Sequence, residues 1–203
     1  MKNIKENIIV GVVGQIASGK GILVRYLTEK LDFASFSLSS IVHAELKKKG
    51  VKEFTRQTLQ DKGDELRKKE GDDVLAKRTI KQIESDKIRW NRIIIEGIRN
   101  PAEIEFLKKN PSFILIGVKA KRKLRFKRLL SRDKEWDPKN YNDFLKIDRR
   151  DLGAGQNKSG QQVRKCLAYC DYVLTNNKDL KDFQRKMEKL FINKLFPSGL
   201  IVK

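Results

Sequence analysis

The segment of residues 14–21 constrains the fold of this chain more than any other, because it joins an apolar run to an amphipathic one. It reads Gly-Gln-Ile-Ala-Ser-Gly-Lys-Gly, after the apolar residues 8–13 and before the amphipathic residues 22–31. This order predicts a strand, a loop and a helix. In such a loop successive backbone N–H groups point into one concavity, to which the helix adds the positive end of its dipole.

The spacing of two glycines and a lysine indicates that this loop binds a triphosphate. Gly14 and Gly19 bracket four residues, and Lys20 follows them, where its ammonium group can reach the β- and γ-phosphates of ATP. An ordinary glycine-rich turn is the alternative, and the order of strand, spacing, lysine and helix disfavours it. The candidate nucleotide-binding residues are Gly14, Gln15, Ile16, Ala17, Ser18, Gly19, Lys20, Gly21 and Ile22.

The residues after the lysine predict an unusual magnesium site. Related loops place a Ser or Thr hydroxyl on Mg²⁺ at this point, and this chain has Gly21 and then Ile22. The metal must therefore be held by phosphates, water and another residue. Glu96 is the candidate, because it follows the apolar run 93–95 at the end of an expected strand, close to the expected phosphate loop. A glutamate that only caps the next turn is the alternative, and Arg99 is expected in the same crevice.

Strands and helices alternate along the whole chain. Apolar runs predict strands at residues 8–13, 33–37, 92–96, 113–118 and 172–175, and amphipathic segments predict helices at residues 22–31, 41–49, 55–70, 72–86, 101–109, 121–132, 141–151, 161–169 and 179–195. Ser39 is the expected N-cap of the helix 41–49. Such alternation implies a three-layer α/β domain of parallel strands, with its ligand at their carboxyl ends. We expect a single domain over residues 1–203, since this length suits one sizeable core.

The formal net charge of +20 is the most unusual feature of the composition. A basic surface attracts nucleic acid and other polyanions. No aromatic residues are interleaved with the basic runs 47–49 and 119–123, as a platform for stacked single-stranded bases would need. We therefore expect part of the charge to surround nucleotide phosphates, and dedicated nucleic-acid binding is the less favoured alternative.

The sequence contains no signal for a membrane span, a disulfide or a zinc site. No apolar run is long enough to cross a bilayer, and the start leads into a strand rather than a signal peptide, so the cytoplasm is the expected location. Cys166 and Cys170 lie on one helical face, where pairing is awkward, so buried free thiols are favoured over a redox pair. The run 43–45 matches the His-x-Glu of zinc deaminases but has no Pro-Cys-x-x-Cys partner.

Taken together, these segments resemble the nucleoside monophosphate kinase and dephospho-CoA kinase group of P-loop kinases, which is related to adenylate kinase. The resemblance covers nearly the whole chain and rests on residues 14–21, 55–67, 96–103 and 160–177, and on Arg128 and Arg132. It implies a parallel five-stranded sheet flanked by helices. It also implies a helical acceptor-binding section at residues 38–90 and an arginine-bearing lid at residues 121–160.

The resemblance assigns roles to individual residues. The catalytic candidates are Lys20, Glu96, Arg128 and Arg132, the acceptor-site candidates are Ser40, His43, Arg56, Arg67 and Arg99, and the metal ligand is Glu96. The lid helix 121–132 suits its role physically, because Arg125, Arg128 and Arg132 recur at helical spacing and could converge on migrating charge. A solvated basic face is the alternative for these arginines.

The chain departs from the family at Ser40 and His43, where relatives usually carry an Asp and an Arg. Loss of that carboxylate need not end phosphoryl transfer, which depends mainly on positioning and charge neutralisation. The departure leaves the rate and the acceptor open. His43, the sole histidine, is either an acceptor ligand or a residue of the helix surface.

The favoured function is ATP- and Mg²⁺-dependent phosphoryl transfer to a nucleotide-like small molecule, expected to be a nucleoside or deoxynucleoside monophosphate. Arg56 and Arg67 can clamp a monophosphate, and Gln57 and Gln60 can read a base edge. A dephospho-CoA kinase-like enzyme is one alternative, although its hydroxyl nucleophile would favour an Asp where Ser40 stands. A non-catalytic nucleotide-binding module, regulatory or associated with RNA, is the other.

Overall fold

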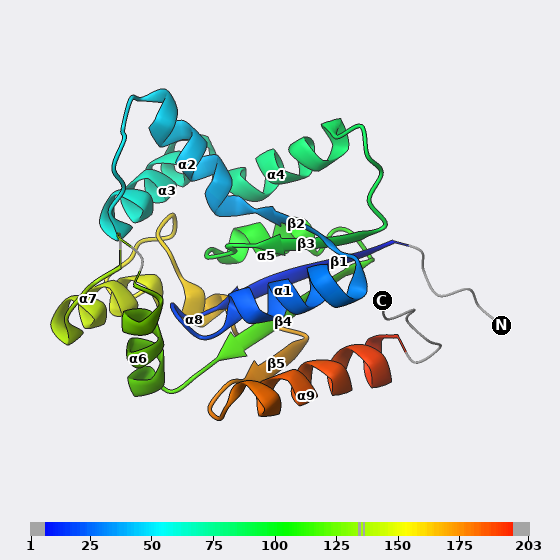
Figure 1. The fold of residues 1–203 in the computed structure, drawn as a ribbon. Coiled ribbons are helices and arrows are strands. Elements are labelled where there is room, and N and C mark those ends of the chain that lie inside the picture. Colours follow the sequence, from blue (N-terminus) through cyan, green and yellow to red (C-terminus); the bar gives the residue numbers. More distant parts are fainter. Residues whose placement is uncertain (1–6, 134, 136, 197–203) are drawn as a thin grey trace.

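A parallel five-stranded sheet forms the centre of the molecule in the computed structural model, which describes residues 7–133, 135 and 137–196 (Figure 1). Its strands are β1 (Ile8–Gly14), β2 (Ala34–Ser37), β3 (Arg92–Glu96), β4 (Phe113–Lys119) and β5 (Tyr172–Thr175), in the order β2-β3-β1-β4-β5. All neighbouring strands run parallel. The three-layer α/β fold expected from the sequence is confirmed. The ends of the expected domain, residues 1–6 and 197–203, and two lid residues, 134 and 136, lie outside the described part.

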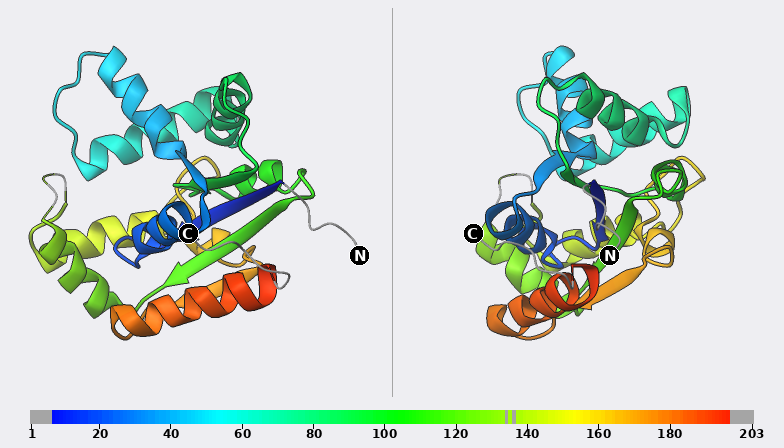
Figure 2. Two further views of the ribbon diagram at one scale, coloured as in Figure 1. Left: turned by 45° about the vertical axis from the view of Figure 1, so that its right-hand side comes forward. Right: turned by 90° about the vertical axis from the view of Figure 1, so that its right-hand side faces the viewer.

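Helices cover both faces of the sheet and extend beyond its carboxyl edge. They are α1 (Lys20–Leu31), α2 (Leu38–Lys48), α3 (Arg56–Glu70), α4 (Val74–Ser85), α5 (Pro101–Leu107), α6 (Arg122–Arg132), α7 (Tyr141–Asp151), α8 (Val163–Cys166) and α9 (Leu180–Leu190), which continues as the π-helical turn η1 (Phe191–Leu195). Figure 2 shows α2, α3 and α4 above the sheet, and α6 and α7 beyond the carboxyl ends of the strands. None of the described helices combines the length and the apolarity that crossing a bilayer requires.

Alternate residues of β1 pack on opposite faces of the sheet, which explains why the strand is apolar throughout. Val10 and Val12 pack with the buried leucines of α1 and with α9. Ile9 and Val13 pack on the other face, with side chains from α2, α4, α5 and α8. A central parallel strand with helices on both sides has no polar face, so its sequence is a continuous apolar run.

Two helices, α2 and α8, differ most from the sequence prediction. Helix α2 begins at Leu38, and its N-cap is Ser37 rather than Ser39. Leu38 is fully buried, so the core already fixes the first turn of this helix. Helix α8 covers only residues 163–166 of the predicted span 161–169. The Gln162 N–H donates to the Arg99 carbonyl oxygen at 2.7 Å, which ties the residues before this helix to the turn after β3.

The two cysteines are free thiols, as the sequence indicates. Cys166 is fully buried against the sheet, and burial raises the pKa of its thiol well above the usual range. Burial also raises the pKa of the Cys170 thiol to about 12. Both groups therefore stay protonated at neutral pH and behave as small apolar side chains.

Candidate active site

The loop between β1 and α1 leaves the first backbone N–H groups of the helix without a side-chain partner. Gly19 is the N-cap of α1 and has a φ of 107°, in the left-handed region that favours glycine. No side chain caps this first turn. Asn176 Nδ2 donates to the Ser18 carbonyl oxygen at 3.0 Å, which holds the loop against the turn after β5. Uncapped N–H groups at the positive end of a helix form a site for an anion.

Lys20 is held inside this loop by backbone carbonyl groups. Its Nζ donates to the carbonyl oxygens of Gly14 at 2.6 Å and Gln15 at 2.9 Å. Burial lowers the pKa of Lys20 to about 7, against the opposing attraction of the Asp151 carboxylate. The ammonium group thus lies beside the N–H groups of the loop, within reach of a phosphate bound there.

The lowered pKa of Lys20 predicts that the affinity for ATP falls as the pH rises. Bound phosphates favour the ammonium form, so binding takes up a proton wherever free Lys20 has lost one, which is above pH 7. We expect the Kd for ATP, measured by titration calorimetry, to rise by up to about tenfold per pH unit above pH 8. Lys20→Arg keeps its charge throughout this range and should remove the trend. An equal trend in Lys20→Arg would contradict the assignment.

The same shift has the opposite sign for the stability of the unliganded protein. The ordinary pKa of lysine is 10.5, and in the folded chain that of Lys20 is about 7. Between these two values the unfolded chain binds more protons than the folded one. The contribution of Lys20 to the free energy of unfolding therefore rises with pH across this window.

Two cavities meet at the carboxyl ends of the strands. The larger, which we call the nucleotide cavity, has a volume of about 610 Å³ and is lined by residues 16–22 together with Arg128, Arg132 and Asp151. The second cavity has a volume of about 250 Å³ and includes Ser39, His43, Arg67 and Gln161 in its wall. Both cavities share four lining residues: Arg56, Gln60, Glu96 and Arg99. Most of the predicted site residues therefore line one cavity or the other.

Asp137 joins two of the predicted arginines, one from α3 and one from α6. Its carboxylate accepts hydrogen bonds from Arg56 Nη2 at 3.0 Å and from Arg132 Nε at 2.6 Å. The Asp137 side chain is only 1% exposed. Although burial alone would raise the pKa of Asp137, the hydrogen bonds from Arg132 and Arg56 hold it below its usual range. The two arginines are thus fixed side by side at the wall of the nucleotide cavity.

Asp151, at the end of α7, holds the third arginine of this region. Arg99 Nη1 donates to Asp151 Oδ1 at 2.7 Å and to Gln161 Oε1 at 3.3 Å. Gln161 Oε1 also accepts from Gln60 Nε2 at 3.1 Å, so a buried pair of amides lies beside the guanidinium. Arg99, Gln60 and Gln161 all line the second cavity.

Three of these residues, Asp137, Asp151 and Gln161, were not predicted from the sequence. Gln161 lies 101 residues from Gln60 along the chain, and Asp137 lies 81 residues from Arg56. No local pattern reports pairing over such distances. A weak signal exists for Asp151 alone, since it follows Asp148 by three residues and therefore shares the inward face of α7.

The expectation that Arg125 converges on the site with the other arginines of α6 is wrong. Arg125 is 1% exposed and makes a bidentate ion pair with Asp148, at 2.6 and 2.9 Å. Its Nη1 also donates to the Ile16 carbonyl oxygen at 3.2 Å, so it supports the phosphate loop from beneath. Arg128 does line the nucleotide cavity, where its guanidinium donates to the Asn176 carbonyl oxygen at 2.9 Å. Helical spacing alone does not distinguish these two positions.

Arg67 lines the second cavity but is committed to an internal ion pair. Its side chain is 1% exposed, and its guanidinium lies 2.9 Å from the fully buried carboxylate of Glu103. The other oxygen of Glu103 accepts the backbone N–H groups of Arg99 and Asn100, at 2.7 and 3.0 Å. This pair therefore shapes the turn after β3, and its role toward an acceptor stays a prediction.

The helix α2 contributes Ser39 and His43 to the second cavity, whereas Ser40 lies outside both cavities. The exposed Ser40 donates its hydroxyl to the Ser37 carbonyl oxygen at 2.6 Å, because α2 begins earlier than expected. The His43 ring packs edge-on against Phe54, with ring centroids 5.1 Å apart. Burial, followed by the charge of Lys47, lowers the pKa of His43, so its ring is neutral at pH 7.

The side chains at the cavity junction fit a magnesium ion that arrives with a nucleotide. Mg²⁺ usually keeps several waters and takes one or two carboxylates in addition to phosphates. Glu96 and Asp151 both line the nucleotide cavity. Across residues 7–133, 135 and 137–196, no group of three or more His, Cys, Asp or Glu could hold a metal unaided. A Cβ added at Gly21 would meet open space, so the missing loop hydroxyl has no steric cause.

Comparisons with known proteins match nearly the whole chain. A family of AAA domains matches residues 13–144. A UPF0200 protein of Pyrococcus horikoshii is 30% identical over 185 residues, which cover 90% of this chain and 95% of the relative. A UPF0200 protein of Methanothermobacter thermautotrophicus is also 30% identical, over 95% of this chain and 93% of the relative.

Solved structures share the fold at low sequence identity. TT1252 of Thermus thermophilus aligns with a TM-score of 0.59 and 14% identity, over 93% of this chain and 98% of its own. Shikimate kinase of Aquifex aeolicus aligns with a TM-score of 0.50 and 14% identity, over 93% of this chain and 99% of its own. The fold is therefore that of the P-loop kinases. By its sequence, the chain belongs to the AAA-domain family, and it also belongs with the UPF0200 proteins.

Proposed function

We propose that this chain transfers the γ-phosphoryl group of ATP to a nucleoside or deoxynucleoside monophosphate. The observation that carries the proposal is the meeting of a larger and a smaller cavity, which share Arg56, Glu96 and Arg99 beside the phosphate loop. ATP would occupy the larger cavity with its phosphates on the loop, and the acceptor would occupy the smaller one. The kinase fold supports this assignment, because it implies nucleotide-dependent phosphoryl transfer.

The junction of the cavities carries charge suited to two phosphorylated substrates. Lys20, Arg56, Arg99 and Arg132 line the nucleotide cavity, and Arg56 and Arg99 also line the second cavity. Phosphoryl transfer requires little covalent chemistry from a protein and depends on positioning and on neutralising the oxygens of the migrating group. Lysine and arginine side chains together meet these two requirements. Lys neutralises phosphate oxygens as a point charge, and Arg positions a phosphate by binding it bidentately.

The second cavity favours a nucleotide acceptor over dephospho-CoA. Val42, Leu59 and Leu75 supply apolar wall, and the buried amides of Gln60 and Gln161 supply donors and acceptors for a base edge. The hydroxyl nucleophile of dephospho-CoA would favour a carboxylate near the start of α2, where this chain has Ser40. A monophosphate oxygen is already anionic at neutral pH and needs no strong base.

Purified protein, ATP and Mg²⁺ should be offered the common ribo- and deoxynucleoside monophosphates and dephospho-CoA in parallel, with ADP release as the readout. We expect turnover only with one or more monophosphates. Gln60→Leu should raise the KM for the acceptor. Gln57, expected from the sequence to read the base edge with Gln60, is exposed and lines neither cavity, so Gln57→Leu is the matched control. Turnover with dephospho-CoA alone would overturn the acceptor. ATP binding without turnover on any acceptor would favour a regulatory module.

Glu96→Gln should retain ATP binding and lose most of its dependence on magnesium. The carboxylate at the end of β3 is the charged oxygen ligand at the junction, whereas a neutral amide is a poor ligand for this hard cation. Turnover and ATP affinity should be measured across a magnesium titration. Gly21→Ser returns a hydroxyl to the loop and should lower the magnesium concentration needed for half-maximal turnover. Identical magnesium curves for Glu96→Gln and the parent would assign the metal to another residue.

A further inference from the structure

We propose that the outer face of α6 binds the phosphate backbone of double-stranded nucleic acid, without regard to sequence. We call this face, together with the two turns beside its start, the α6 ridge. Its lysines are Lys123 and Lys127 on α6, Lys119 at the end of β4, Lys121 just before α6, and Lys178 in the turn after β5. All five side chains are exposed, and none lines the nucleotide cavity or the second cavity. The inference is independent of the proposed phosphoryl transfer.

Positive charge is concentrated in residues 119–132, a segment that contains no acidic residue of its own. Residues 119–132 include eight basic residues and no Asp or Glu, namely Lys119, Lys121, Arg122, Lys123, Arg125, Lys127, Arg128 and Arg132. The section 38–90 is far more balanced, with 14 Lys and Arg against 10 Asp and Glu. The charge of α6 and its approach thus stands out from the general basicity of the chain.

The arginines and the lysines of α6 differ in their partners. Arg122 and Arg125 pair with Asp148, and Arg132 pairs with Asp137. Within the described part of the chain, no carboxylate lies at ion-pair distance from a ridge lysine. The inward cations of this helix are therefore neutralised by the protein, while the outward ones remain available to an external anion.

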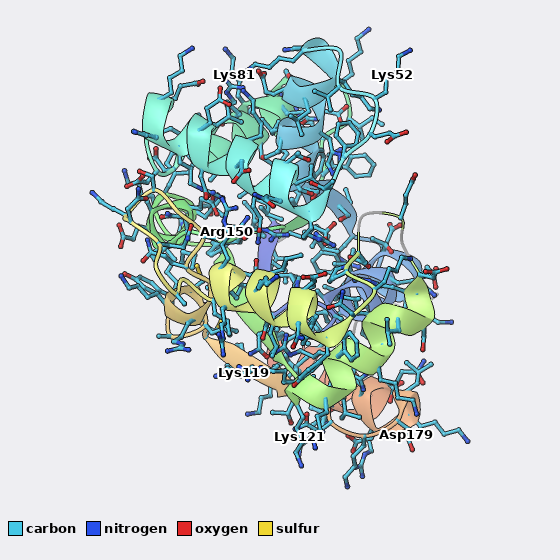
Figure 3. The ribbon with its side chains drawn as sticks, turned by 90° about the vertical axis from the view of Figure 1, so that its left-hand side faces the viewer. Lys52, Lys81, Lys119, Lys121, Arg150 and Asp179 are labelled. Carbon is cyan, nitrogen blue, oxygen red and sulfur yellow. The ribbon has the colours of Figure 1, made fainter. Side chains whose placement is uncertain are left out.

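Two turns lie side by side and bring lysines from distant parts of the chain together. The Asn176 N–H donates to the Lys119 carbonyl oxygen at 2.8 Å, and the Lys121 N–H donates to Asn177 Oδ1 at 2.8 Å. Lys178 follows directly in the second turn. From there Lys123 and Lys127 continue along α6, one helical turn or about 6 Å apart. Figure 3 shows Lys119 and Lys121 at the edge of the molecule opposite to Lys52 and Lys81.

This arrangement is unfavourable for the fold itself. The first turn of α6 contains no acidic residue, and Lys121 and Lys123 add positive charge at the positive end of the helix dipole. Like charges along the ridge also repel one another. A polyanion bound to the ridge would reverse both effects, so the pattern suits a binding surface better than a structural helix.

The chemistry of the ridge fits phosphates rather than bases or a lipid surface. Lysine ammonium groups on flexible stems bind phosphate as point charges, and contacts of this kind carry no sequence information. Phe126, the aromatic residue of α6, packs against Tyr141 and Phe144 rather than forming a stacking platform. Leu130 is the one exposed large apolar residue of α6, fewer than a helix lying in a membrane interface uses.

Binding of the full chain to short fluorescent duplexes, followed by anisotropy, tests the inference. The ridge variant carries Lys119→Glu, Lys121→Glu, Lys123→Glu and Lys127→Glu. The control variant has the same change in net charge at the opposite end of the molecule and carries Lys52→Glu, Lys68→Glu, Lys69→Glu and Lys81→Glu. Each variant is tested with RNA duplexes and with DNA duplexes, because both present a phosphate backbone. Two unrelated sequences are used for each type of duplex.

We expect the ridge variant to bind at least about tenfold more weakly than the parent, and the control to stay within about threefold. The slope of log K against log salt should fall by about 3 to 4 in the ridge variant, one contact for each lysine. The two sequences should bind alike. A stronger signal from one duplex type would identify the backbone form that the ridge prefers.

Several outcomes would overturn the inference. These are equal losses in the two variants, or no duplex binding by the parent at low salt. Ridge-dependent binding to phosphatidylserine vesicles, with duplex binding unchanged, would assign the face to a membrane surface instead. Misfolding is checked by thermal unfolding, where glutamates at the α6 N-terminus should keep or raise the midpoint. ATP affinity, measured alongside, reports separately on the nucleotide cavity.

Discussion

Lys20→Ala should lower the affinity for ATP by about 100-fold or more. The variant removes the one ammonium group held within the phosphate loop, where hydrogen bonds to charged groups are worth about 1.5–3 kcal/mol each. Two hydrogen bonds of this strength from Lys20 to the phosphates of bound ATP would contribute about 3 kcal/mol or more. Every 1.4 kcal/mol is roughly tenfold in affinity. The side chain bonds to the Gly14 and Gln15 carbonyl oxygens, which water can bond in the variant, so the fold should remain.

Titration calorimetry with ATP gives the affinity, and circular dichroism reports the fold. Lys30→Ala is the matched control, because Lys30 is an exposed residue in the last turn of the same helix. Thermal stability should not fall in Lys20→Ala, since burial of the ammonium group is itself unfavourable. An affinity equal to that of the parent would refute the phosphate-loop assignment.

Asp148→Ala should destabilise the protein more than any change at the surface of α6 or α7. The substitution leaves the buried guanidinium of Arg125 without its bidentate partner. Breaking a buried pair from one side costs about 3–5 kcal/mol. For a chain of this size, we expect the midpoint of thermal unfolding to fall by roughly 10 °C.

Two further variants separate this effect from a general loss of charge. Arg122 makes an exposed contact with the same carboxylate, at 3.3 Å, so Arg122→Ala should change stability by less than about 1 kcal/mol. The double variant Arg125→Met with Asp148→Leu removes both charges and should recover most of the loss. A double variant as unstable as Asp148→Ala would show that the packing of these side chains matters more than their charge.

The sequence was sufficient for the sheet and the phosphate loop because both depend on local patterns. The β1 residues are apolar without interruption, and the glycines and lysine that follow have one spacing. The start of α2 was predicted wrongly because it does not depend on a local pattern. Its first residue, Leu38, is fixed by burial in the core, and the expected cap Ser39 lies inside the helix.

The candidate site was only partly predictable. Lys20, Glu96 and Arg99 follow from their places after a strand, and all line the nucleotide cavity. Asp137 and Asp151 were not predicted, because their role depends on pairing with arginines that are far away in the sequence. Arg125 was misassigned for the converse reason: spacing along a helix identifies a shared face but does not reveal a buried carboxylate beneath it.

Three arginines of the nucleotide cavity already pair with carboxylates. Arg56 and Arg132 pair with Asp137, and Arg99 pairs with Asp151. An entering phosphate must therefore displace a carboxylate or share its guanidinium, and much of each new attraction is cancelled by the one lost. A lone phosphate ion gains little from such an exchange. A nucleotide gains more, because its other phosphates reach the loop N–H groups at the same time. Asp137 and Asp151 thus compete with small anions of the solution for these arginines and favour binding of a nucleotide over binding of a lone phosphate.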